Sequence, residues 1–148
     1  LDLPLKVAHN DPKITNVLFN RQGASVSIID LDTVMPGYSL HDFGDLVRSM
    51  ANSVTEDHPN IDEVSLLADR YEALYAGFCD GAADSLDSIE QKQLPLGALY
   101  IILEQAVRFY ADYLMGNIYY RVKNDDHNLL RAKNQLALFQ HLQHYLAK

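Results

Sequence analysis

The chain has 148 residues, of which 48% are hydrophobic and 22% charged, which is the composition of one globular domain with its own core. Its 12 basic and 20 acidic residues give a formal net charge of −8, which disfavours a nucleic-acid partner. A lone Cys79 excludes an internal disulfide and a cysteine-based zinc cluster, and because the sequence shows no membrane-spanning run or signal peptide we expect a cytoplasmic protein without a membrane partner.

The first third of the chain predicts a polar loop followed by a β-hairpin. Pro12 excludes regular helix from the loop. Gly23 tolerates the positive φ that a tight turn requires. The residues after this turn alternate and then become wholly apolar, which is typical of a returning strand. In chain order we expect an apolar lead-in (1–8), a loop (9–16), a strand (17–19), a turn (20–23) and a second strand (25–31).

The remainder predicts helices, because apolar residues recur there at helical spacing. In chain order we expect a loop (32–40), a helix (42–52), a polar linker (52–60), a helix (61–78), an acidic loop (79–87), a helix (89–115) and a last helix (128–147). Asp42 is a candidate N-cap for the first of these helices. Pro95 is a candidate break in the long one. The sequence therefore predicts a single domain over 1–148, an α+β fold that is predominantly helical, with a small two-stranded hairpin and four to five helices.

Polar residues around the hairpin suit phosphoryl transfer. Attack on a γ-phosphate needs an oriented hydroxyl and neutralised negative charge, with little covalent help from the protein. Asp11 is the candidate base that orients a hydroxyl and accepts its proton. Asn16, five residues later, and Asp30, at the end of the second strand, supply the hard oxygen ligands that magnesium prefers.

Two neighbouring residues have less defined roles in this constellation. Asp32 shares a strand face with Asp30 if the extended geometry persists, and would then be a second metal ligand or an outer group. His9 is expected to brace the loop through hydrogen bonds, because the hard oxygens around it disfavour an imidazole ligand.

The segment from His9 to Asn16 resembles the catalytic loop of protein-kinase-like phosphotransferases, in the form found in the aminoglycoside phosphotransferase and choline kinase superfamily. Ile29-Asp30-Leu31-Asp32 resembles the metal-binding strand end of that superfamily, and Asp42 resembles the aspartate that anchors its catalytic loop. We interpret Asp42-Phe43-Gly44, which spells the protein-kinase metal motif, as a coincidence, because it lies beyond a further loop. Residues 29–37, 42–45, 108–114 and 127–131 are most similar to the N-acetylhexosamine 1-kinase family.

This resemblance implies the C-terminal lobe of a two-lobed kinase that uses ATP and Mg²⁺. It implies Asp11 as the base with His9 beside it, and Asn10, Arg108 and Tyr119 as contacts of an amino-sugar substrate. The sequence contains no Gly-x-Gly loop to clamp the triphosphate. We therefore expect that clamp on an N-terminal lobe absent from this chain, and no activity from the chain alone.

Two alternatives remain open. The acceptor could be choline or an aminoglycoside, because the acidic segments 79–87 and 124–126 would suit a cation. The chain could also be a non-catalytic kinase-like binding lobe. The intact set of Asp11, Asn16 and Asp30 argues against that second alternative.

Overall fold

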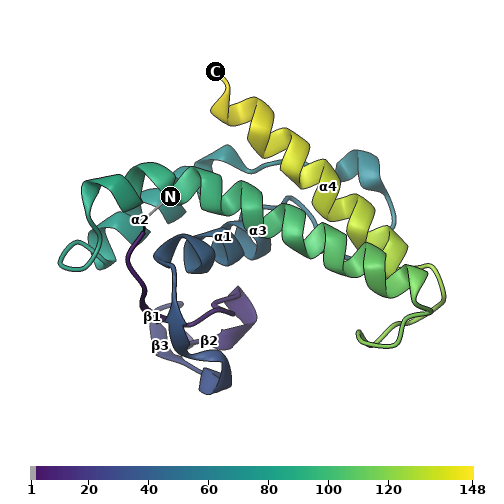
Figure 1. The fold of residues 1–148 in the computed structure, drawn as a ribbon, viewed down its shortest axis with the longest axis horizontal. Helices are drawn as coiled ribbons and strands as arrows, with labels where there is room; N and C mark the ends of the chain where they lie inside the picture. Colours follow the sequence, from purple (N-terminus) through teal and green to yellow (C-terminus); the bar gives the residue numbers. More distant parts are fainter. Residues whose placement is uncertain (1–2) are drawn as a thin grey trace.

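The computed structural model describes residues 3–148, so the first two residues of the predicted lead-in and domain lie outside it. A small β region lies below a group of helices in Figure 1. The strands are β1 (Lys6–Ala8), β2 (Val17–Phe19), β3 (Ser25–Ile28) and β4 (Met35–Gly37), and the helices are α1 (Ser39–Met50), α2 (Ala68–Gly81), α3 (Ser88–Leu114) and α4 (His127–Leu146). Within this range the structure confirms the predominantly helical α+β fold and the hairpin.

The predicted hairpin is formed by β2 and β3, which pair antiparallel with Val17 opposite Ile28. Its turn is organised by Asn20, whose side-chain oxygen accepts hydrogen bonds from the backbone N–H groups of Gln22 and Ala24, both at 3.0 Å. Gly23 has a φ of 81°, as the turn requires. The second strand ends at Ile28 rather than at residue 31, because Asp30 turns the chain with a φ of 65°.

A second ladder was missed by the sequence analysis. Strands β1 and β4 pair antiparallel, with Lys6 opposite Gly37, where an apolar lead-in and a loop had been predicted. Each strand has three residues, which is too short for alternation to show. Pro36, which has no N–H to donate, is tolerated because a two-stranded ladder consists of edge strands.

Two helix boundaries correct the predictions. Helix α1 begins at Ser39, so Asp42 lies in its first turn and Tyr38 occupies the N-cap position. The predicted helix over 61–78 begins only at Ala68: residues 61–63 form a short 3-10 turn, and Asn52 then bridges to Leu66. The N–H of Leu67 bonds to the carbonyl of Ala51, so residues 64–67 are held as an extended segment beside the end of α1.

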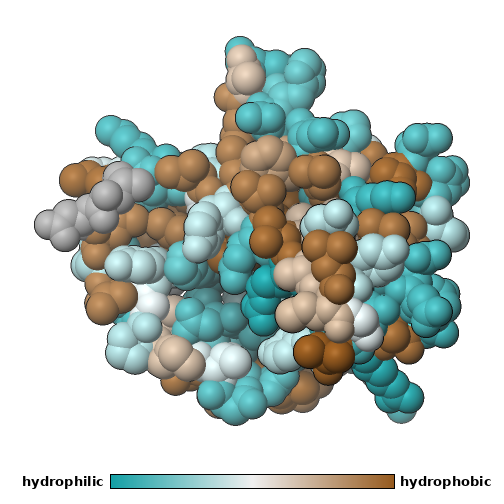
Figure 2. All heavy atoms as spheres, turned by 45° about the vertical axis from the view of Figure 1, so that its right-hand side comes forward, coloured by the Kyte–Doolittle hydropathy of each residue, from teal (hydrophilic) through white to brown (hydrophobic). Residues whose placement is uncertain are grey.

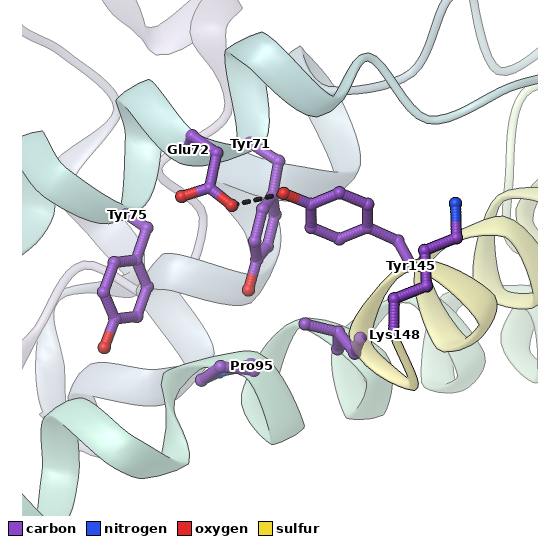
Figure 3. A pocket seen from close by; sticks show the side chains of 7 residues that line it. Tyr71, Glu72, Tyr75, Pro95, Tyr145 and Lys148 are labelled. Carbon is purple, nitrogen blue, oxygen red and sulfur yellow. Dashed lines mark hydrogen bonds between the residues drawn. The ribbon is translucent and has the colours of Figure 1, made fainter.

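Helix α3 continues through Pro95 without a break. A proline inside a helix has no N–H for the carbonyl four residues earlier, here that of Gln91. The hydroxyl of Tyr75, on α2, donates to this carbonyl at 3.3 Å and replaces the missing donor. Tyr75 and Pro95 lie close together in Figure 3. The predicted break is therefore absent because another helix satisfies the free carbonyl.

The core lies among the helices. Phe43 and Val47 on α1, with Leu138 and Leu142 on α4, are fully buried. Helices α1 and α3 pack closely at Gly44, which has no side chain to hold them apart. A Cβ at this position would lie 2.7 Å from the carbonyl oxygen of Gly97. Gly44 is thus a packing residue inside a helix. None of the helices in the described part of the chain is both long and apolar enough to cross a membrane.

Candidate active site

The loop from His9 to Asp11 is held from two sides. The carboxylate of Asp42 accepts hydrogen bonds from the backbone N–H groups of His9, at 2.8 Å, and Asn10, at 2.7 Å. On the other side, Thr33 Oγ1 donates to the carbonyl of His9 at 2.7 Å. Asn10 has a φ of 62°, which turns the chain sharply just before Asp11. These contacts fix the backbone that carries the predicted base.

The side chain of Asn10 is also engaged in this loop. Its amide donates to the carbonyl oxygens of Thr33, at 3.1 Å, and Ala8, at 3.3 Å. A Cβ on Gly37 would lie 2.8 Å from Asn10 Oδ1, so glycine leaves the space that this side chain fills. The contacts of Asn10 are with the protein itself, and its predicted substrate contact remains a prediction.

Asp11 is partly exposed and has two close partners. Lys13 Nζ lies 2.6 Å from Asp11 Oδ2. Asn16 Nδ2 donates to the backbone carbonyl of Asp11 at 2.9 Å and to Oδ2 at 3.3 Å. The structure shows that Lys13 pairs with the predicted base.

The predicted metal ligands Asn16 and Asp30 both lie near the end of the hairpin. Asn16 is 5% exposed, and because its Nδ2 faces Asp11, its Oδ1 is left as an acceptor. Its backbone carbonyl accepts from the N–H of Ile29 at 2.9 Å, which brings the chain just before Asp30 against it. An amide oxygen and an exposed carboxylate fit a hard cation such as magnesium. Residues 3–148 hold no group of three or more His, Cys, Asp or Glu side chains arranged for a metal.

The remaining two residues of the predicted constellation lie beside this pair. Asp32 is exposed within a 3-10 turn, Leu31–Thr33. The argument that it shares a strand face with Asp30 is therefore wrong, since the strand has already ended, and its metal role stays a prediction without that support. His9 Nε2 lies 3.3 Å from the carbonyl oxygen of Ile29, so the imidazole links the loop to the end of β3.

A cleft of about 990 Å³ opens beside Asp11. Its lining contains Asn10, Asp11, Arg108 and Tyr119 of the predicted site, whereas His9, Asn16, Asp30, Asp32 and Asp42 lie outside it. The opposite walls come from α1, from α3 and from the segment around residues 54–56. A hollow with mostly hydrophilic walls is visible near the middle of the face in Figure 2. The fold thus brings the predicted base and the predicted substrate contacts to one cavity, although about 100 residues separate them in the chain.

The charges in one wall form a chain of ion pairs. Arg48 lies 2.7 Å from Asp45 and 3.0 Å from Glu56, and Arg131 lies 3.2 Å from Glu56. Burial raises the pKa of Asp45, Arg48 partly offsets this, and the nearby charge of Asp11 raises the pKa further. The sequence analysis did not assign Asp45, Glu56 or Arg131 to the site. The only available signal was the spacing of Asp45 and Arg48, one helical turn apart.

Arg108 and Tyr119 lie side by side at the far end of the cleft. The guanidinium carbon of Arg108 is 5.9 Å from the ring centroids of both Tyr119 and Tyr120, which is cation–π distance. Gln105 Nε2 donates to the Tyr120 hydroxyl at 3.1 Å. Tyr119 itself is 71% exposed. The cleft that contains Asp11 therefore also offers an exposed aromatic ring and planar donors.

A comparison with known protein families identifies the family of the chain. The model of the phosphotransferase enzyme family matches residues 1–79, which include the loop, the hairpin and α1. The chain belongs to this family. The match confirms the aminoglycoside phosphotransferase and choline kinase superfamily, and with it enzyme activity of the kinase type. Residues 80–148, which carry Arg108 and Tyr119, lie outside the matched segment.

A second pocket of this phosphotransferase, of about 430 Å³, lies between α2, α3 and α4. Tyr71, Tyr75 and Tyr145 surround it, and Glu72 accepts a hydrogen bond from the Tyr145 hydroxyl (Figure 3). Burial raises the pKa of Tyr71, so its phenol is neutral. None of the predicted site residues is in its lining. We attribute this pocket to the junction at Pro95, where the tyrosines pack beside the interrupted helical hydrogen bond.

Proposed function

We propose that the protein transfers the γ-phosphoryl group of ATP, with Mg²⁺, to the anomeric hydroxyl of an N-acetylhexosamine. The observation that carries the proposal is the cleft of about 990 Å³ that has Asp11 on one wall and Arg108 with Tyr119 on another. A cavity of this size suits one sugar together with the end of a triphosphate.

In this proposal Asp11 accepts the proton of the attacking hydroxyl. The hydroxyl oxygen forms a bond to the γ-phosphorus, the bond from that phosphorus to the bridging oxygen of ADP breaks, and ADP leaves with the electron pair. A carboxylate is sufficient as base because proton transfer is late in such reactions. Lys13 Nζ, 2.6 Å from Asp11 Oδ2, holds this carboxylate in orientation and adds positive charge near the transferred group.

Asn16 and Asp30 are the residues proposed to hold the magnesium ion. The ion, when bound, neutralises phosphate charge and orients the triphosphate. The side chain of Asn16, which is itself a proposed metal ligand, also donates to Asp11. One buried amide is therefore in contact with the proposed base. Groups that grip the rest of the triphosphate are proposed to come from a further lobe, since this sequence has no Gly-x-Gly loop.

Arg108 and Tyr119 are the proposed sugar contacts, with Asn10 near the reacting hydroxyl. A guanidinium offers several planar donors to hydroxyl and carbonyl oxygens, and a tyrosine ring covers the apolar face of a pyranose. The 71% exposure of Tyr119 supports this use, because it leaves aromatic surface of this ring accessible in the cleft.

A cationic acceptor is the second candidate. Glu104 and Glu56 line the same cleft, and Tyr100 adds an aromatic ring, which together would suit choline or an aminoglycoside. Against this, Glu56 is paired with Arg48 and Arg131, so part of the acidic charge is neutralised.

The test is an acceptor panel with the full-length protein and MgATP, with products identified by ³¹P NMR. N-Acetylglucosamine and N-acetylgalactosamine are expected to give sugar 1-phosphates. Methyl N-acetylglucosaminide, whose anomeric oxygen is blocked, is the matched control and is expected to give none. Phosphorylation of choline or kanamycin instead would replace the sugar proposal with the second candidate, and transfer to no acceptor in the panel would contradict both.

A further inference from the structure

A buried carboxylate outside the catalytic loop faces the loop that carries Tyr119. We propose that Asp112, assisted by Asn128, is a positioning residue of the acceptor cleft, which holds residues 116–120 so that Tyr119 and Tyr120 stay against Arg108. This inference rests on the proposed function for the identity of the acceptor, while the anchoring itself is independent of it.

Asp112 lies in the last turns of α3 and is 2% exposed. Its Oδ1 accepts the backbone N–H of Tyr119 at 2.8 Å, and its Oδ2 accepts the backbone N–H of Tyr120 at 2.9 Å. The side-chain amide of Asn128, which is fully buried, donates to the same Oδ2 at 2.8 Å. A carboxylate is acceptor-only, so it satisfies several donors at once, which a side-chain amide in its place would not do.

The backbone between Asp112 and Tyr119 is built to reverse direction. Gly116 has a φ of 87° and Asn117 a φ of 60°, two consecutive left-handed residues that end α3 and return the chain over Asp112. The N–H of Asn117 bonds to the Asp112 carbonyl at 2.8 Å. Asn117 Oδ1 accepts from Asn128 Nδ2 at 3.0 Å, so α4 holds the same reversal.

This anchor is continuous with the cleft wall. Asn128 Oδ1 accepts from Arg131 Nη1 at 3.4 Å, and Arg131 is the residue that pairs with Glu56. The Tyr120 ring lies 4.8 Å from that of Phe109, and the Arg131 guanidinium carbon lies 5.0 Å from the Phe109 ring centroid. The buried acid thus fixes the backbone of two tyrosines whose rings, with Arg108, form the far wall.

The ionisation of Asp112 fits this use. Burial alone would raise its pKa, but the N–H groups of Tyr120, Tyr119 and Ile118 and the Asn128 amide outweigh burial and hold the pKa below its ordinary value. The partners of Asp112 are neutral donors: backbone N–H groups of the loop and the side-chain amide of Asn128 on α4. A buried carboxylate with such partners holds the loop backbone in place.

The first experiment measures the anchor itself. Hydrogen exchange of the Tyr119 and Tyr120 amides is compared between the wild type, Asp112→Asn and the control Asp126→Asn, which removes an exposed acid that makes no cap hydrogen bond. We expect exchange about 10- to 100-fold faster in Asp112→Asn, the factor for losing hydrogen bonds to a charged acceptor, and no change in the control. Unchanged protection of both amides in Asp112→Asn would overturn the proposal.

The second experiment measures the consequence in the full-length protein. With the acceptor that the wild type phosphorylates, Asp112→Asn is expected to raise the KM for that acceptor about tenfold or more, with the KM for ATP within about twofold of the wild type. If the acceptor found is not an N-acetylhexosamine, the proposed function fails, and the same comparison made with the acceptor found still decides this inference. Equal changes in both KM values, or a change in kcat alone, would overturn the positioning role.

Asn117→Gly is a second, milder variant that tests the same anchor if Asp112→Asn does not fold. Glycine keeps the left-handed backbone at this position and removes a side-chain amide with two hydrogen bonds: Oδ1 accepts from Asn128 Nδ2, and Nδ2 donates to the carbonyl of Asp125 at 2.8 Å. We expect a rise of a few-fold in the acceptor KM alone, since only neutral hydrogen bonds are lost and the Asp112 carboxylate stays in place. An unchanged acceptor KM in this variant, with faster exchange in the loop, would overturn the link between the anchor and the cleft.

Discussion

The β region before α1 and the helices that follow it are stabilised in different ways. Among the described residues before α1, the buried hydrophobic set contains Ala8 alone, whereas α1, α3 and α4 bury a continuous core around Phe43, Ile102 and Leu138. Large apolar side chains of the β region remain exposed: Leu5, Val7, Leu18, Phe19, Val26, Ile28, Ile29, Leu31, Val34 and Met35. The residues proposed for the chemistry therefore lie on the part of the chain with the least core of its own.

Polar contacts join the two regions. Asp42 of α1 holds the backbone of His9 and Asn10, and Lys6 of β1 is paired with Glu90 at the start of α3. Hydrogen bonds of this kind fix direction and register but contribute little net stability. We infer that the packed helices supply most of the stability, and that a few polar residues hold the loop from His9 to Asp11 in a fixed position against them.

The largest effect on stability is expected from the core. Phe43→Ala removes a fully buried ring that packs edge-on against Tyr71, Tyr75 and Phe78. It should lower the free energy of unfolding by about 3–5 kcal/mol, measured by urea denaturation followed by circular dichroism. The matched change in the β region, Val7→Thr at a residue that is 85% exposed, should change it by less than about 0.5 kcal/mol. Similar costs for the two variants would contradict the division between the regions.

Asp42→Ala should separate activity from stability. It leaves the N–H groups of His9 and Asn10 without their acceptor, which we expect to cost about 1–2 kcal/mol of folding stability. Asp11 directly follows Asn10 in the chain, so loss of this anchor should misplace the proposed base. We therefore expect kcat to fall by about tenfold or more. The comparison is with Asp69→Ala, which removes an exposed acid from the first turn of α2. Loss of kcat no greater than in Asp69→Ala would show that the loop does not need this anchor.

The smallest effect concerns a polar contact between two loops of the helical region. The hydrogen bond from Lys123, at 2.5 Å, lowers the pKa of Asp57 from 3.8 to about 2. A carboxyl whose folded pKa is depressed contributes stability above its unfolded pKa, and loses it as pH falls through the folded one. Asp57→Asn should therefore cost up to about 1 kcal/mol at pH 7, since solvent screens this partly exposed pair.

The difference in free energy of unfolding between the wild type and Asp57→Asn should become smaller as the pH is lowered from 4 toward 2. Unfolding curves recorded at several pH values measure it. High salt should narrow it as well, because the Lys123 side chain is exposed. A difference independent of both pH and salt would contradict an electrostatic origin.

Much of the fold could be predicted from local patterns, and the failures have local causes. The hairpin was predicted because Asn20 and Gly23 are turn residues between two short apolar runs. The β1–β4 ladder was missed because it joins residues 6–8 with residues 35–37, two segments that are distant in the chain and too short to show a strand pattern. Pro95 predicted a break that Tyr75, from another helix, prevents. Tertiary contacts of this kind leave no mark in a local pattern.

The site divides in the same way. Asp11, Asn16 and Asp30 could be proposed as a set from the sequence because their spacing follows from one loop and one hairpin. The pairing of Lys13 with Asp11 could not be predicted, since the sequence position of a charge two residues away does not show which way its side chain points. Asp45, Glu56 and Arg131 reach the cleft only through helix packing. The role proposed for Asp112 depends on backbone N–H groups that no side-chain motif reveals.

The central claim is that Asp11 acts as the base for phosphoryl transfer in the cleft. The most direct test is phosphate transfer from ATP to N-acetylglucosamine by full-length wild type and Asp11→Asn, with folding checked by circular dichroism. Because the amide accepts no proton, we expect kcat to fall by at least about 10²- to 10⁴-fold, with an unchanged unfolding transition. Transfer by Asp11→Asn within a few-fold of the wild-type rate would contradict the account.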